Sequence, residues 1–197
     1  YFSPLGVFLG ATPLQIGALA TLPPFLGAIF QVLGMKLSER SSSRRSTVLA
    51  LIRAQALVCL PIAALPIIFG QGWLASALLI VLVAFYHVTI GLIAPIWNSL
   101  AGDIIPPASR GEFFGYRNKW MAILTFSAVL AAGQALHQTT AFGITGWGYC
   151  GVVVFAAAAR FFSSLPLRAV ADPELHIPQE SKDRKSTRLN SSHTDIS

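Results

Sequence analysis

Charged residues in this chain are gathered into short segments that separate long apolar runs. One of these segments, residues 95–121, is charged at five positions: Asp103, Arg110, Glu112, Arg117 and Lys119. The runs on either side of it are almost free of charge. A chain that crosses a lipid bilayer repeatedly has this pattern, because charge is costly in hydrocarbon and collects in the connections. The pattern predicts an all-α, polytopic transmembrane helix bundle.

The composition supports this class and argues against an enzyme. Hydrophobic residues make up 54% of the chain and charged residues 11%, whereas a soluble domain carries about 25% charged residues. Cys59 and Cys150 lie inside apolar runs without metal-ligand spacing, so we interpret them as buried hydrophobic residues. No nucleophile with a partnered base and no cluster of metal ligands is found in the sequence. We therefore expect no catalytic residue, no metal and no cofactor.

Five apolar runs are long enough to cross about 30 Å of hydrocarbon at about 1.5 Å per residue. They are predicted as spans at residues 13–36, 47–70, 73–101, 119–136 and 149–167. Residues 1–9 resemble the last turns of a cut helix that precedes them. The predicted bundle thus occupies residues 1–170.

The carboxyl-terminal part of the sequence has a different character. Residues 171–181 are predicted to begin a cytoplasmic central loop. Residues 182–197 resemble translated sequencing-adapter DNA, and the alternative is a natural polar tail. We leave this last segment out of the functional interpretation and expect the chain to be a fragment of a longer protein.

The basic residues predict the orientation in the membrane. The connections at 37–46 and 102–119 contain six Lys and Arg between them, and those at 70–73 and 137–148 contain none. Because cytoplasmic connections carry the excess of positive charge, the two basic connections are expected on the cytoplasmic side. We expect an integral, multi-pass protein of the bacterial cytoplasmic (inner) membrane, and the basic clusters do not suggest nucleic-acid binding.

The first complete span also carries a stripe of small and polar residues. They recur at alternating steps of three and four residues, at Gly17, Ala20, Pro24, Gly27, Gln31 and Gly34. That spacing places them on one face of a helix, where another helix can approach closely.

Two charged connections resemble those of a known family. Asp103-Ile-Ile-Pro-Pro-Ala-Ser-Arg110-Gly111-Glu-Phe-Phe-Gly115-Tyr-Arg117 is similar to the connection between the fourth and fifth helices of major facilitator superfamily transporters. The segment from Glu39 to Arg45, Glu-Arg-Ser-Ser-Ser-Arg-Arg, resembles their connection between helices two and three, although a serine replaces the usual loop glycine. The chain therefore resembles the amino-terminal six-helix half of such a transporter, with its first helix truncated.

The resemblance implies secondary active transport of a small solute by alternating access, together with a carboxyl-terminal half of the same protein. It also implies a latch that closes the cytoplasmic side through carboxylate–guanidinium pairs and close helix contacts. The residues assigned to this latch are Glu39, Arg40, Arg44, Arg45, Asp103, Arg110, Gly111, Gly115 and Arg117. A simpler interpretation is that these charges only fix the orientation and that the glycines only pack.

Polar residues at membrane depth are the candidates for the solute path. We assign His87, Trp97, Asn98 and Gln31 to it, with His87 a possible solute or proton ligand. The alternative for His87 is a hydrogen bond to a neighbouring helix. Gln31, Gln55 and Gln134 also fit interhelical hydrogen bonds. Arg160 fits a side chain that extends to the cytoplasmic interface better than the alternative, an anion-binding role.

The expected partners are the lipid bilayer, a small-molecule substrate and a coupling proton or other ion. The alternative function is that of a non-transporting membrane sensor or assembly subunit on the same helical scaffold. An uptake assay separates the two, since a sensor binds its ligand without moving it.

Overall fold

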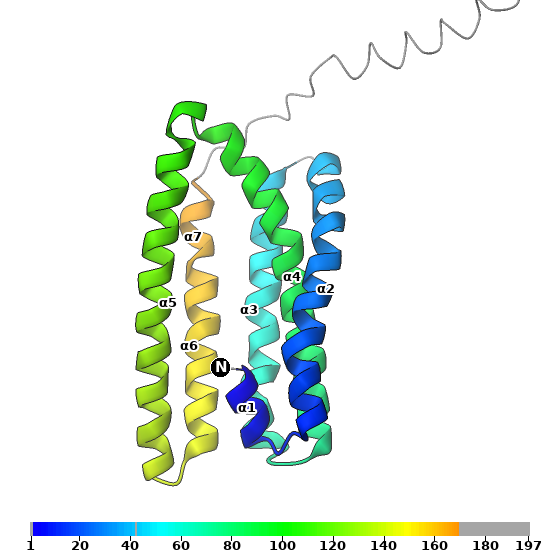
Figure 1. Cartoon of the computed structure of the whole chain (residues 1–197), viewed down its shortest axis with the longest axis vertical. Coiled ribbons are helices and arrows are strands. Elements are labelled where there is room, and N and C mark those ends of the chain that lie inside the picture. The colour runs from blue at the N-terminus through cyan, green and yellow to red at the C-terminus, as the bar shows by residue number, and fades with distance from the viewer. Residues whose placement is uncertain (1, 42, 170–197) are drawn as a thin grey trace, which may run out of the picture.

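The computed structural model describes residues 2–41 and 43–169, and within them it is a bundle of helices without strands (Figure 1). In chain order these are α1 (Phe2–Phe8), α2 (Pro13–Arg40), α3 (Arg44–Ile68), α4 (Trp73–Ile104), the 3-10 turn η1 (Pro107–Ser109), α5 (Arg110–Ala141), α6 (Thr145–Phe162) and α7 (Ser164–Leu167). Five helical stretches of this part are long and apolar enough to cross a membrane. The predicted all-α transmembrane bundle is confirmed. The central loop and the adapter-like tail predicted for 171–197 lie outside the described residues.

The helices extend beyond the predicted spans at the charged end of the bundle. α2 continues to Arg40, and α5 begins at Arg110, so much of the charged segment 102–119 is helical. The break in that segment is at Pro106 and Pro107, where α4 has ended and α5 has not begun. Proline lacks the amide hydrogen that a helix needs and disfavours helical geometry in the residue before it, which explains the position of this turn.

The long helices run up and down, and their charges gather at one end (Figure 1). The turns 41–43 and 105–109 lie at this end, together with α7, and the turns 9–12, 69–72 and 142–144 lie at the other. The helix ends beside the first two turns carry charges such as Arg44, Asp103 and Arg110, whereas neither the three opposite turns nor the helix ends beside them contain Lys, Arg, Asp or Glu. The two ends of the described bundle are thus chemically different, as the orientation prediction requires.

Local signals explain where several helices begin and end. The Thr12 hydroxyl accepts a hydrogen bond from the Gln15 amide, and the Gln15 side chain accepts one from the Thr12 amide, which forms a capping box before α2. Ser43 caps α3 by accepting from the Ser46 amide at 3.1 Å. At the uncharged end, Gly70 and Gly143 follow helices with φ of 59° and 71°, a conformation that suits glycine.

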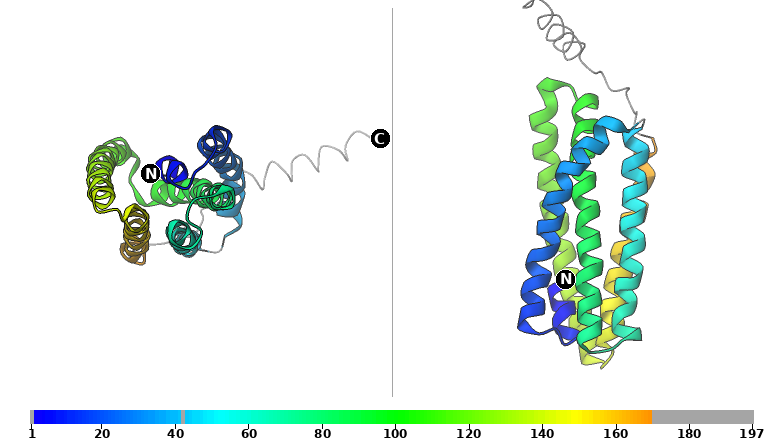
Figure 2. Two further views of the ribbon diagram at one scale, coloured as in Figure 1. Left: turned by 90° about the horizontal axis from the view of Figure 1, so that it is seen from below. Right: turned by 90° about the vertical axis from the view of Figure 1, so that its right-hand side faces the viewer.

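α2 and α4 form the most extensive helix pair, and they lie side by side over much of their length (Figure 2). Glycines allow this approach. A Cβ on Gly34 would lie 2.8 Å from the carbonyl oxygen of Leu92, and one on Gly91 would overlap the carbonyl oxygen of Gly27. Contact between the two backbones therefore depends on small residues in both helices.

The predicted stripe of small and polar residues along α2 is only partly correct. Gly27 and Gly34 are buried, but Gly17, Ala20 and Gln31 are exposed. The buried line instead follows steps of four and seven residues: Leu19, Pro23, Gly27, Gly34 and Ser38. Rows of i and i+4 residues incline across a helix, so a partner that crosses at an angle covers this line rather than a straight face.

α5 has the weakest support in the described part of the chain. It packs along α6, and Leu136 is its one buried residue. Seen along the helix axes, α5 and α2 stand on opposite sides of the bundle (Figure 2). α1 lies between them, and its Leu5 and the following Leu9 belong to the core.

Candidate functional site: a membrane cavity below a charged helix end

An ion pair joins the beginning of α3 to the end of α4. Nη1 of Arg44 lies 2.7 Å from Oδ2 of Asp103 and donates a 2.9 Å hydrogen bond to Oγ of Ser99. The Arg44 side chain is 2% exposed, whereas that of Asp103 is 47% exposed. The structure thus brings together two of the residues assigned to the latch, within a single bundle.

Arg110 has a different partner from the one that sequence reasoning suggested. Its guanidinium donates to the carbonyl oxygens of Gly102 and Ile105, at the C-terminal end of α4. The last carbonyls of a helix have no partner within the helix and carry partial negative charge, so a guanidinium satisfies and stabilises them. In the described part of the chain, Arg110 caps α4 and forms no carboxylate pair.

The other latch residues of the described part lie at the same end. Arg45 donates a 3.0 Å hydrogen bond to the carbonyl oxygen of Arg168, and Glu39 is exposed. The helix contact predicted at Gly111 and Gly115 is absent from the described residues, since both are exposed and a Cβ on either would meet nothing within 4 Å. The side chain of Arg40 lies outside the described part.

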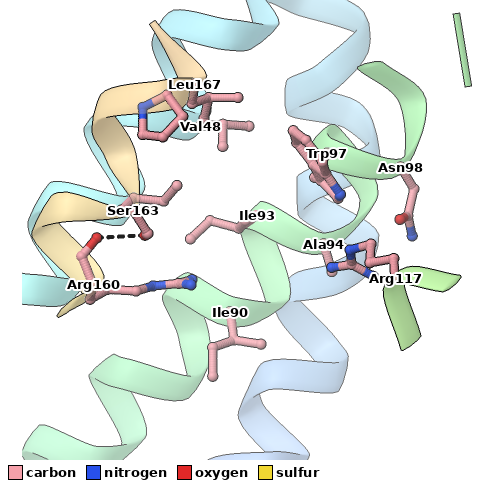
Figure 3. Close-up of a pocket in the computed structure, with 12 residues that line it drawn as sticks. Val48, Ile90, Ile93, Ala94, Trp97, Asn98, Arg117, Arg160, Ser163 and Leu167 are labelled. Atoms are coloured by element: carbon pink, nitrogen blue, oxygen red, sulfur yellow. Dashed lines mark hydrogen bonds between the residues drawn. The ribbon is translucent and has the colours of Figure 1, made fainter. Parts of the chain in front are cut away.

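A cavity of about 560 Å³ lies below this end, between α3, α4, α5, α6 and α7 (Figure 3). Apolar side chains form much of its wall, and the polar contributions come from Trp97, Asn98, Arg117, Arg160 and Ser163. Two of the four residues assigned to the solute path, Trp97 and Asn98, therefore lie at one cavity. Arg117, which was assigned to the latch, also lines it.

Arg160 does not extend to the cytoplasmic interface as predicted. Its Nε donates to Oε1 of Gln55, and Nε2 of Gln55 donates to the Tyr86 carbonyl oxygen at 3.4 Å. Gln55 is fully buried, so its amide ties α3 to α6 and α4 inside the bundle. Figure 3 shows the Arg160 guanidinium directed from α6 toward the segment of α4 that carries Ile90. The interhelical hydrogen bond predicted for Gln55 is confirmed.

His87 and Gln31 do not line the cavity. Nδ1 of His87 lies 3.0 Å from the Val83 carbonyl oxygen in the same helix, and the ring stacks edge-on against Phe2. Gln31 and Gln134 are exposed and form no hydrogen bond within the described residues, contrary to the interhelical bonds considered for them. The functional roles of His87 and Gln31 stay predictions.

Sequence reasoning missed the inward position of Arg160 and the place of Ser163 in the cavity wall. A signal for Arg160 was present, because an arginine within an apolar run needs a partner at membrane depth. Its partner, Gln55, is 105 residues away in the chain. Only the packing of α3 against α6 identifies it.

Comparison with known proteins gives one family. The family model of the Major Facilitator Superfamily matches residues 2–191. No curated protein and no solved structure matches the chain.

Proposed function

The chain belongs to the major facilitator superfamily, and from this premise we propose that it acts in secondary active transport of a small solute by alternating access. Membership makes the protein an integral, multi-pass membrane transporter in general terms, and the five long apolar helices agree with that. In alternating access, two helical halves rock against each other around a site near the middle of the membrane. We propose that this chain supplies the amino-terminal half.

The observation that carries the proposal is the cavity lined by Trp97 and Asn98, which lies below a charged helix end. Polar side chains are costly in hydrocarbon, so a group of them around a space at membrane depth suits a solute path. We propose Trp97 and Asn98 as its lining residues. Gln31, which is exposed on α2, would contribute from the surface that meets the second half.

The charged end suits a cytoplasmic latch. Asp103 is half exposed, so it can exchange Arg44 for another cation without a large change in its own hydration. Switchable pairs of this kind suit a protein whose halves separate and rejoin in each cycle. We propose that the turns at 41–43 and 105–109 face the cytoplasm, in the inner membrane of a bacterium.

The carboxyl-terminal half of the transporter would pack against surfaces that are exposed in the described bundle. Gly111 and Gly115 present bare backbone on one side of α5, with space for a closely packed helix. A carboxyl-terminal half of the same protein is the partner that we propose for this surface. A proton or another ion would couple transport to an existing gradient.

Charge reversal at Arg110 in the complete protein tests the latch. Arg110→Glu removes charge-assisted hydrogen bonds, worth about 1.5–3 kcal/mol each, from the end of α4. We expect solute uptake into proteoliposomes to fall by roughly tenfold or more while membrane insertion is retained. Lys119→Glu, the same reversal at an exposed position of α5, should leave uptake nearly unchanged.

Normal uptake by the Arg110 variant would contradict the latch. If the complete protein binds a solute but moves none in any variant, the sensor or assembly function considered from the sequence would replace transport.

A further inference from the structure

The cavity wall has a one-sided charge. Arg117 comes from α5 and Arg160 from α6, and none of the described residues that line the cavity is Asp or Glu. The one ion pair of the described chain, between Arg44 and Asp103, includes neither arginine. The wall between the two guanidiniums is mostly apolar, with Ile90 and Ile93 among its residues. Two positive charges therefore face one space without a described counter-charge.

Most N–H donors of the Arg160 guanidinium are available to the cavity. A guanidinium has five N–H donors, and in the described structure only Nε of Arg160 is used, by Gln55. Because Gln55 holds Nε from α3, the terminal nitrogens are directed toward the cavity (Figure 3). A fixed guanidinium with a free planar edge is the geometry that binds a carboxylate or phosphate through two parallel hydrogen bonds.

A second donor is also without a partner. Nε1 of Trp97 is buried and makes no hydrogen bond in the structure, and Trp97 lines the same cavity. A buried donor without an acceptor costs free energy, about 1–3 kcal/mol, unless something occupies the site. The Asn98 amide lies at the same wall and adds further hydrogen-bonding capacity.

The depth of Arg160 bears on the source of an anion, which can be a dissolved solute or a lipid headgroup. Arg160, Gln55 and the Tyr86 carbonyl form one hydrogen-bonded layer. Arg160 lies 15 residues along α6 from Thr145, which places it about 22 Å from the uncharged end of the bundle. In the other direction Arg160 lies in the last turn of α6, eight residues or about 12 Å from Arg168 at the charged end. The layer is therefore far from the uncharged surface and nearer to the charged one, so the experiment below includes an arm for a lipid headgroup.

We propose that this cavity binds a small organic anion with a carboxylate or phosphate group, which Arg160 grips and which Arg117, Trp97 and Asn98 help to enclose. This inference rests on the proposed transport function and names the substrate class for it. The apolar wall suits the hydrocarbon part of such a solute, and the two guanidiniums compensate its charge on leaving water. Gln55 acts as a positioning residue, because it touches Arg160 rather than the solute.

Thermal unfolding of the complete protein in phosphatidylcholine nanodiscs tests the binding. The probes are benzoate, succinate and inorganic phosphate, with benzamide and succinamide as neutral analogues. We expect at least one anion, but not its neutral analogue, to raise the unfolding temperature. Arg160→Gln should raise the concentration needed for half of that shift by roughly tenfold to a hundredfold, whereas Arg160→Lys should recover part of the affinity.

Two further variants test whether the effect is specific to Arg160. Gln55→Glu leaves Arg160 in place but gives it a permanent carboxylate partner, so anion binding should weaken as in Arg160→Gln. Arg53→Gln removes an arginine of α3 that does not line the cavity and should leave the shift unchanged. A shift that is equal for anions and neutral analogues, or equal in all these variants, would overturn the proposal. So would stabilisation seen only when phosphatidylglycerol is added, since that would identify a lipid site.

Uptake separates this inference from the transport proposal. If the complete protein moves a neutral solute and Arg160→Gln does not affect it, the anion class is wrong and transport stands. If an anion binds through Arg160 but is never moved, the site stands and transport is wrong.

Discussion

The residues of the Arg44–Asp103 pair differ in their surroundings, and this asymmetry decides what each contributes. Arg44 is almost fully buried and also holds Ser99, whereas Asp103 is half exposed. The loss of its carboxylate partner costs free energy for a buried cation, because water cannot replace the pairing. An exposed carboxylate that loses its cation is hydrated by water instead. Substitutions on the two sides of the pair are therefore not equivalent.

Asp103→Ala should lower the free energy of unfolding by about 1–3 kcal/mol, because it removes the carboxylate that pairs with the almost fully buried Arg44 guanidinium. Chemical denaturation in detergent micelles measures this. Glu112→Ala is the control, since Glu112 is exposed and forms no ion pair in the described residues, and it should change stability by less than about 0.5 kcal/mol. Equal effects of the two variants would show that the pair contributes nothing.

Sequence reasoning identified residue types better than their partners. It found that Arg44 and Asp103 belong to charged helix ends, because such ends are visible in the local pattern. It could not assign Arg110 to the carbonyls that end α4, since the Pro106-Pro107 turn determines where that helix stops. Partners that come from other helices depend on crossing angles that local spacing does not encode.

Among the helices, α2 and α4 are closely interlocked and α5 is loosely attached. The glycines of the first pair bring backbone against backbone, whereas almost all of α5 faces outward. An exposed apolar helix is normal beside lipid, and it also leaves room for a second helical half. The most closely packed part of the described bundle is therefore the part that contains α4.

Gly91→Ala should destabilise the protein by roughly 1–3 kcal/mol, because its Cβ would overlap the Gly27 carbonyl oxygen and force α2 away from α4. Gly102→Ala is the matched control in the same helix. A Cβ there meets nothing within 4 Å, and loss of glycine flexibility should stabilise the folded state by up to about 1 kcal/mol. Denaturation of both variants under one set of conditions provides the comparison, and destabilisation by both would contradict the packing argument.

The number of long helices could be predicted from the sequence, whereas the buried face of a helix could be predicted only in part. Each span is a local property of about 20 apolar residues, so the five long helices follow from the sequence. The stripe on α2 was placed on a straight face, but α4 crosses it and buries Pro23 and Ser38 instead of Pro24 and Gln31. Where two helices cross, periodicity alone does not select the contact line.

The molecule as a whole is polarised from end to end. The turns at 41–43 and 105–109 belong to the charged end, and the turns 69–72 and 142–144 carry no charged residue. Because cytoplasmic connections carry the excess of positive charge, we expect the charged end of this bundle on the cytoplasmic side.

Cysteine labelling tests this orientation. In a background that replaces Cys59 and Cys150 with alanine, Ile144→Cys should react with an impermeant maleimide in intact cells. Ala108→Cys should react only after the membrane is opened, because its turn is expected in the cytoplasm. Both positions are exposed, so accessibility within the fold does not differ between them. The reverse labelling pattern would show that the orientation in the membrane is opposite to the predicted one.

The bond between Gln55 and Arg160 also bears on how the protein is made. A ribosome delivers α3 to the membrane well before α6, so the buried amide is in place when the arginine arrives. An arginine within a membrane-spanning helix carries a cost on insertion, and an acceptor that is already in place offsets part of that cost. During biosynthesis, Gln55 would therefore serve as a docking point for α6, and its loss should reduce the yield of protein before it alters any property of the finished molecule.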